Sequence, residues 1–250
     1  MLTCRCQWKF QTSKGTSASC PVDTYSSAGI AVTWAPYFQK RLMSQIQQQT
    51  LEDHLEQLKK CTACPNMIGP VITPTPVISK VYLCGQAPGP REGSFGRPFA
   101  WTAGKTMFKW FETIGLNEEQ FRSVAFIGAV CRCFPGKTKQ GGDRVPSALE
   151  VSTCASWMSR EFQLMKPELI VPVGRLAIEQ FLPIAPLNEI IGKKFQVEAF
   201  GQQCDVIPLP HPSGASTWFK REPGITLLAE ALTLLGSHPA WAQIVSSTRN

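Results

Sequence analysis

Two short motifs, far apart in the chain, carry the side chains best suited to chemistry. The first is Gly85-Gln86-Ala87-Pro88-Gly89, and the second is His211-Pro212-Ser213-Gly214. Each motif follows an apolar run, at 80–84 and 206–210. Glycine and proline loops at the ends of buried strands let the backbone approach a ligand closely. The sequence therefore predicts two ligand-binding loops, one with an amide side chain and one with an imidazole.

The elements that must position these loops alternate along the chain. Helix-like and strand-like runs that alternate in this way predict a parallel sheet covered by helices. Ligands bind beyond the carboxyl ends of such strands, so both loops should face one cleft at one edge of the sheet. We expect a three-layer α/β/α fold with a central four-stranded parallel sheet. The strand-like runs are 79–84, 123–130, 169–173 and 204–209, and the helix-like runs are 45–60, 103–114, 147–165, 174–182 and 224–236.

Composition divides the chain into three parts. Residues 1–42 are rich in Ser, Thr and Cys, contain one acidic residue and show no sustained period. We expect a disordered tail or an over-extended gene start there, a folded domain at 43–240 and a C-terminal tail at 241–250. The alternatives for residues 1–42 are an organellar transit peptide, because such peptides are basic and poor in acids, and a functional arm.

The overall composition limits the classes of partner. The net charge of +7 suits a polyanionic partner, and the 43% hydrophobic content is enough for a core. No apolar run approaches the ~18 residues of a membrane span. We therefore expect no membrane partner and a cytoplasmic location. Ten cysteines in a long chain with no clear secretory leader favour metal or redox chemistry over a disulfide scaffold.

The spacing of the cysteines predicts a metal centre. Cys61 and Cys64 lie in a Cys-x-x-Cys sequence, in which a turn brings the two sulfurs together. Cys133 and Cys154 lie farther on, and Cys131 is a rival for Cys133. Four thiolates suit either a tetrahedral zinc ion or a 4Fe–4S cluster, and the spacing alone does not choose between them.

The order of short motifs resembles the uracil-DNA glycosylase superfamily, and is nearest to its iron–sulfur (family 4 and family 5) branches. The resemblance covers about Cys61 to Leu235. It implies a DNA glycosylase with a 4Fe–4S cluster bound by Cys61, Cys64, Cys133 and Cys154. The matching motifs are Cys61-Thr62-Ala63-Cys64, Gly85-Gln86-Ala87-Pro88-Gly89, Gly96-Arg97-Pro98-Phe99, Ala103-Gly104, Arg132-Cys133-Phe134-Pro135, Asp143-Arg144-Val145-Pro146, Cys154 and His211-Pro212-Ser213.

The resemblance also implies roles at the substrate. Cutting a base from its sugar leaves an anionic base, so the site must stabilise that charge, hold a water and grip the extruded nucleotide. His211 matches the donor to the base, and Phe99 matches the aromatic that stacks on it. Gln86 would position the water. The remaining expected substrate contacts are Gly85, Ala87, Pro88, Gly89, Ala129 and Ser213.

The loop after the second motif matches a segment that, in relatives, wedges into the minor groove. Cations on this loop would hold flanking phosphates. An ordinary helix-entry loop with solvated charges is the alternative. The expected DNA-binding residues are Arg97, Gly214, Trp218, Lys220 and Arg221.

Three positions depart from the family pattern. Gln86 stands where the commonest iron–sulfur branch has Glu, and an amide is not a general base near neutral pH. Ala129 stands where many relatives have an Asn that reads the edge of uracil. Trp101 replaces a usual glycine. These departures favour two alternatives, a catalytically weak nucleic-acid-binding protein of the same fold and a glycosylase for a different damaged base.

Taken together, the motifs predict a monofunctional hydrolase that removes uracil, or another deaminated base, from DNA in base excision repair. No lysine has the context of a Schiff-base nucleophile, so we expect no lyase step. We expect a monomer whose partner is DNA containing a damaged base. A zinc-stabilised structural protein is the remaining alternative.

Overall fold

The computed structural model describes residues 35–214 and 216–249, so the expectation for 1–34 lies outside the described residues. The strands are β1 Val81–Gly85, β2 Phe126–Ala129, β3 Leu169–Pro172, β4 Phe195–Ala199 and β5 Gln202–Val206. The helices are α1 Ala35–Lys59, α2 Glu92–Phe95, α3 Thr102–Glu112, α4 Glu118–Val124, α5 Ala148–Met165, α6 Arg175–Ile178, α7 Leu187–Ile190, α8 Gly224–Ser237 and α9 Pro239–Ser247, with a short 3-10 helix η1 at Trp218–Lys220.

The centre of the fold is a five-stranded sheet with the order β2-β1-β3-β5-β4. The first four strands in this order are parallel, and β4 runs antiparallel to β5 at the edge. The expectation of a four-stranded parallel sheet is thus wrong in strand number and in the edge pairing. The extra strand forms a hairpin, in which Phe200 and Gly201 both adopt left-handed φ angles of 51° and 77°. Such a two-residue turn matches the twist of the strands that it connects.

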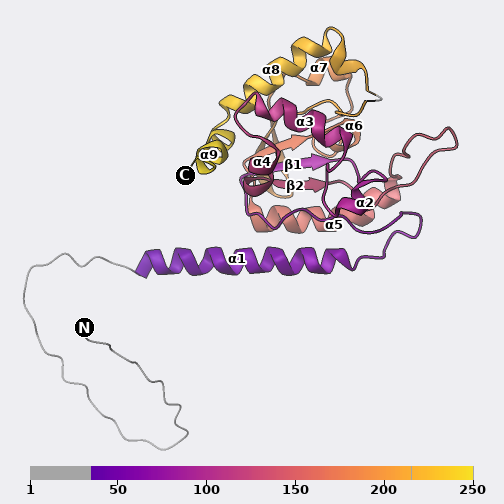
Figure 1. The fold of residues 1–250 in the computed structure, drawn as a ribbon. Coiled ribbons are helices and arrows are strands. Elements are labelled where there is room, and N and C mark those ends of the chain that lie inside the picture. Colours follow the sequence, from indigo (N-terminus) through magenta and orange to yellow (C-terminus); the bar gives the residue numbers. More distant parts are fainter. Residues whose placement is uncertain (1–34, 215, 250) are drawn as a thin grey trace, which may run out of the picture.

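Helices cover both faces of the sheet (Figure 1). On one face, α5 packs on β1 through Phe162 and Tyr82, whose ring centroids are 4.8 Å apart, and α1 packs on α5. On the other face, α3, α4 and α9 meet through the rings of Phe111, Phe121 and Trp241. These layers place the core around β1 and β3, whose side chains are buried throughout.

The ends of the domain differ from the expected bounds. Helix α1 begins at Ala35, within the predicted N-terminal tail, and its helical spacing buries Leu51, Leu55 and Leu58. At the other end, α9 occupies most of the predicted C-terminal tail. Trp241 is fully buried there and donates from Nε1 to the carbonyl oxygen of Ile114 over 3.1 Å. The C-terminal helix therefore belongs to the core. Within the described ranges, no helix is long and apolar enough to cross a membrane.

Candidate functional site

The two loops meet at one cavity of about 500 Å³ beyond the carboxyl ends of the parallel strands. Gly85 is the last residue of β1, and the loop after it is held by the N–H of Cys131, which donates to the carbonyl oxygen of Gln86. The N–H of Gly174 donates to Leu209 and holds the second loop beside the end of β3. All of the residues expected at the substrate line this cavity: Gly85, Gln86, Ala87, Pro88, Gly89, Phe99, Ala129, His211 and Ser213.

The environment of His211 fixes the state of its ring. The imidazole packs against Gly174, where an added Cβ would approach His211 Cδ2 to 2.9 Å. The backbone N–H of Ser213 donates to His211 Nδ1 over 3.3 Å, so the neutral ring carries its proton on Nε2. Burial lowers the pKa of His211, although the charge of Asp143 opposes this effect. The ring is therefore a neutral imidazole with Nε2–H available as a donor.

Phe99 forms an aromatic wall of the cavity. Its ring lies over Gly85, where an added Cβ would come within 2.8 Å of two ring carbons. Its backbone has a φ of 52°, an uncommon value for a bulky residue. The guanidinium of Arg122 holds this backbone by donating to the carbonyl oxygens of Pro98 at 2.9 Å and Phe99 at 3.0 Å. The position of the Phe99 ring thus depends on the space left by Gly85 and on the hydrogen bonds from Arg122.

Two acidic side chains, Glu92 and Asp143, also line the cavity, and neither was expected to contact the substrate. Glu92 is only 8% exposed, and its carboxylate lies against Gly89 of the first loop, where an added Cβ would come within 2.8 Å of Oε2. Burial raises the pKa of Glu92, and the nearby charge of Asp143 raises it further. The cavity therefore contains a carboxyl group even though Gln86 is an amide. An acid placed shortly after a Gly/Pro loop was the available signal in the sequence.

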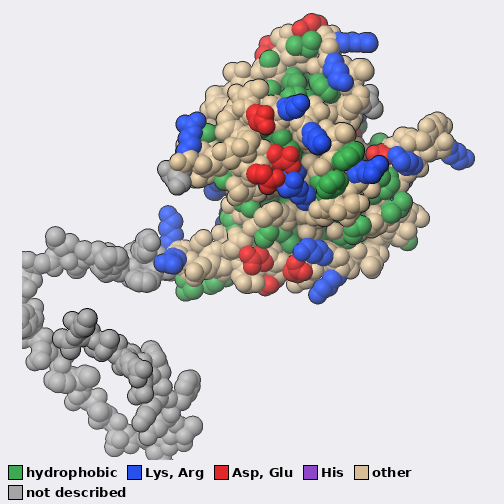
Figure 2. Space-filling model, in the orientation of Figure 1, with side chains coloured by type: hydrophobic (Ala, Val, Ile, Leu, Met, Phe, Trp, Pro, Cys, Tyr) green, Lys and Arg blue, Asp and Glu red, His purple; other side chains and the backbone are tan. Residues whose placement is uncertain are grey.

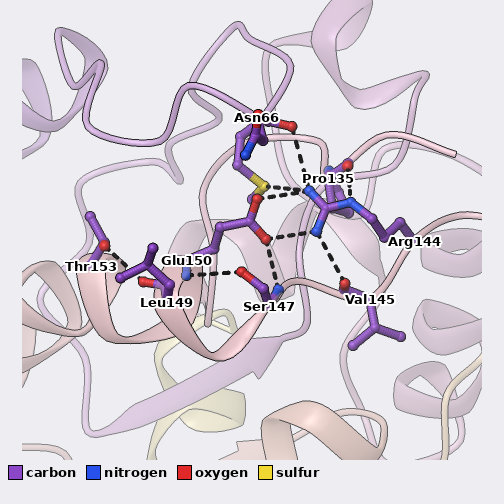
Figure 3. Close-up of polar contacts among 9 residues, drawn as sticks. Asn66, Pro135, Arg144, Val145, Ser147, Leu149, Glu150 and Thr153 are labelled. Carbon is purple, nitrogen blue, oxygen red and sulfur yellow. Dashed lines mark hydrogen bonds and ion pairs between the residues drawn. The ribbon is translucent and has the colours of Figure 1, made fainter.

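Arg144 connects the cavity wall to helix α5 (Figure 3). Its guanidinium makes a two-pronged contact with the carboxylate of Glu150 at 2.7 and 2.8 Å, and its Nε donates to the carbonyl oxygen of Pro135. Glu150 also accepts the backbone N–H of Ser147 and so caps α5. The hydrogen bonds from Arg144 lower the pKa of Glu150 to about 2. A second guanidinium nitrogen reaches the carbonyl oxygen of Asn66, close to the cysteine motif.

The four cysteines of the expected metal centre line a second cavity, of about 560 Å³, beside the first one. Apolar side chains of Leu58, Met67 and Val71 complete its wall. In the described part of the chain, no three donor side chains stand close enough to hold a single metal ion. Four thiolates around one cavity are the donor set of either a 4Fe–4S cluster or a zinc ion. The residues are Cys61, Cys64, Cys133 and Cys154.

Cys131, the rival for Cys133, does not line this cavity. Its side chain is fully buried and lies next to that of Cys154. Burial raises the pKa of Cys133 to about 11, and the neighbouring cysteine charges contribute to the rise. A bound cation would favour the thiolate of Cys133, because a coordinating thiol is deprotonated.

The expected DNA-binding residues lie apart from the cavity lining. Arg97 is not free, because it pairs with Glu118 at 3.4 Å and Glu119 at 3.0 Å and thereby braces α4. Trp218 is anchored by a hydrogen bond from its Nε1 to Asn188 Oδ1 at 2.8 Å. Exposed positions in this group are Arg97, Gly214, Lys220 and Arg221.

The sequence of this chain is similar to those of known proteins. A family model described as the Uracil DNA glycosylase superfamily matches residues 75–235. The chain is 29% identical to the Type-4 uracil-DNA glycosylase of Archaeoglobus fulgidus over 140 residues, which are 54% of this chain and 66% of that protein. It is 27% identical to the Type-4 enzyme of Thermotoga maritima over 176 residues, covering 66% and 83% of the two chains.

A Type-5 uracil-DNA glycosylase of Pyrobaculum aerophilum is 24% identical over 163 residues, covering 53% of this chain and 70% of that protein. The chain thus spans about two thirds of the length of several curated relatives that it matches.

Proposed function

The chain belongs to the uracil-DNA glycosylase superfamily, because the family model covers well over half of its length, and on this premise we propose that it hydrolyses the N-glycosidic bond of uracil in DNA. The observation that carries the proposal is His211, a neutral imidazole with a fixed donor at the wall of a cavity that an aromatic ring also lines. The proposed enzyme is monofunctional and acts in base excision repair.

In the proposed reaction, the bond to the sugar breaks early and the base leaves as an anion. His211 Nε2–H donates to a base oxygen, and one such preorganised donor contributes about 2.7–4 kcal/mol to the transition state. Phe99 stacks on the extruded base, which contributes about 1–3 kcal/mol. Gln86 orients the attacking water, and Glu92 offers a carboxylate in the same cavity. A water held between these groups would attack the sugar carbon and lose its proton to the carboxylate.

We also propose that Cys61, Cys64, Cys133 and Cys154 hold a 4Fe–4S cluster. When bound, the cluster would supply iron–thiolate bonds that join the segment after α1, the loop after β2 and helix α5. Arg144 already joins the same three segments through Asn66, Pro135 and Glu150. The cluster would therefore stabilise the segments that hold Arg144 in the wall of the base cavity.

Ala129 favours a second candidate, a glycosylase for another deaminated base. This residue lines the cavity where many relatives have an amide, and its methyl group offers no hydrogen bond to the edge of uracil. A cavity without that amide discriminates less between bases that share a carbonyl oxygen facing His211.

The experiment is a single-turnover screen of purified protein on single- and double-stranded oligonucleotides bearing uracil, hypoxanthine, xanthine or a thymine mismatch. Uracil release that leaves an intact strand with an abasic site supports a monofunctional uracil-DNA glycosylase, and His211→Ala is the inactive control. Preferred release of another base would support the second candidate. DNA binding without release of any base would contradict both and support a binding protein of this fold.

A further inference from the structure

Two exposed aromatic rings stand at the rim of the base cavity. Trp101 is 39% exposed and Phe95 is 50% exposed, and their rings stack with centroids 5.8 Å apart and planes 28° apart. Trp101 precedes α3 and lines the cavity, while Phe95 ends α2. Stacked aromatic surface exposed beside a ligand cavity provides a flat face for another planar group.

Two cations lie over the ring of Trp101. The guanidinium carbon of Arg91 lies 5.3 Å from the ring centroid of Trp101, and Lys105 Nζ lies 5.6 Å from it. Among the side chains that the structure describes, no acid pairs with either cation. Figure 2 shows hydrophobic side chains and Lys and Arg side chains gathered on the face where α2 and α3 lie. The rim therefore joins a stacking surface to unpaired positive charge.

We propose that Trp101 and Phe95, flanked by Arg91 and Lys105, form a stacking platform for an unpaired nucleotide next to the one whose base enters the cavity. We call these four residues the rim platform. The inference rests on the proposed function, because a DNA strand must lead into the cavity. It adds a preference for single-stranded over duplex DNA.

The chemistry of the rim platform selects this partner. A base in a single strand has a free face and can stack on an exposed ring, whatever its sequence. In a duplex the neighbours of an extruded nucleotide remain stacked and paired, so they cannot lie flat on Trp101. The two cations lie over the Trp101 ring and would attract the phosphates of a nucleotide bound at the rim. Loss of one stacking contact is expected to weaken single-strand binding roughly tenfold.

The test measures binding of undamaged DNA, which does not require catalysis. Fluorescence anisotropy would give the affinity of the cluster-containing protein for a labelled single strand and for its duplex at several salt concentrations. Trp101→Ala should lose roughly tenfold affinity for the single strand and less than about twofold for the duplex. Lys105→Ala should lower the slope of log affinity against log salt by about 0.7 for the single strand.

Two matched controls keep the test specific. Phe200→Asn removes a ring of the same 39% exposure from the hairpin turn, and Asn tolerates the left-handed backbone there. Lys109→Ala removes an exposed cation one helical turn beyond Lys105. Both should leave the two affinities unchanged, and circular dichroism would verify that all variants fold.

Equal losses on single strand and duplex, or no loss with Trp101→Ala, would overturn the rim platform. These outcomes are separate from those of the proposed function. If the wild-type protein excises no base but its single-strand binding depends on Trp101, the rim platform is supported and the proposed glycosylase activity is refuted. If the protein excises uracil but the Trp101→Ala variant binds single strands equally well, the glycosylase activity is supported and the rim platform is refuted.

Discussion

Ser213 holds His211 in one tautomer, because its backbone N–H donates to Nδ1 of the imidazole over 3.3 Å. The bond comes from the backbone, so it depends on the path of the loop and not on the serine hydroxyl. Gly174 makes room for the ring on its other side. His211 Nε2–H is thus oriented by two loops, which follow the neighbouring parallel strands β3 and β5.

The first prediction follows from this orientation. His211→Ala should slow single-turnover excision about 10²–10³-fold, because it removes the donor to the departing base. Gln86→Ala should cost only about tenfold, since its amide orients water and cannot take a proton. Ser213→Ala retains the backbone N–H and should change the rate little. If Gln86→Ala proves slower than His211→Ala, water positioning dominates and the assigned roles are wrong.

The second prediction concerns pH. Burial lowers the pKa of His211 below the usual 6.5, so the folded protein disfavours the protonated ring. The neutral ring should therefore persist as the pH falls through 6.5, and the excision rate should decline only at lower pH. A pH titration of the ring signals by NMR, alongside single-turnover rates, measures both. A ring midpoint at or above 6.5 would contradict the effect of burial.

The third prediction separates Cys133 from Cys131. Cys133→Ser should abolish the broad absorbance of the cluster and lower the iron content, because Cys133 lines the second cavity. Cys131→Ala should retain iron, since its side chain lies outside that cavity. Iron and acid-labile sulfide analysis of anaerobically purified protein gives the readout. Stoichiometric zinc without iron in the wild type would contradict the cluster.

The parallel part of the fold could be predicted because its strands are continuous apolar runs. The edge strand β4 could not, since Gln196 and Glu198 face solvent and give the segment the composition of a loop. Helix α9 was missed for a different reason. Burial of Trp241 depends on the rings of Phe111 and Phe121, which are more than a hundred residues away in the chain.

The candidate site was predictable to a similar extent. The two loops converge because each follows a parallel strand, and this can be inferred from strand order alone. The position of Glu92 shortly after the first loop could be read from the sequence, but its burial and the nearby charge of Asp143 could not, because Asp143 lies far along the chain. Arg97 was expected at DNA, but the sequence does not reveal that Glu118 and Glu119 of α4 come within salt-bridge distance.

The fourth prediction is a loss of stability in acid. Hydrogen bonds from Arg144 lower the pKa of Glu150 from the usual 4.5 to about 2 in the folded protein. The pair therefore stabilises the fold fully above pH 4.5, and this contribution is lost as the pH falls toward 2. Glu150→Gln should lower Tm at neutral pH, and the difference from wild type should shrink in acid. Arg144→Gln should show the same trend, and a constant difference in Tm across this range would refute it.

The fifth prediction is that Gly85 and Phe99 are energetically coupled. Gly85→Ala would place a Cβ within 2.8 Å of the Phe99 ring, so the ring must move away from the base position. Since a stacked base contributes about 1–3 kcal/mol, this substitution should slow uracil excision roughly five- to a hundredfold. Phe99→Ala should cost a similar factor, because it removes the same ring.

The double variant provides the decisive measurement. With Phe99 already truncated, the added methyl group of Gly85→Ala meets no ring, and the second substitution should add less than about twofold. Single-turnover rates of the four proteins form a double-mutant cycle, in which contacting residues give non-additive effects. Retained cluster absorbance in each variant would exclude general unfolding. Losses that multiply in the double variant would instead mean that Gly85 acts on the base or the backbone directly, and that the position of the Phe99 ring does not depend on it.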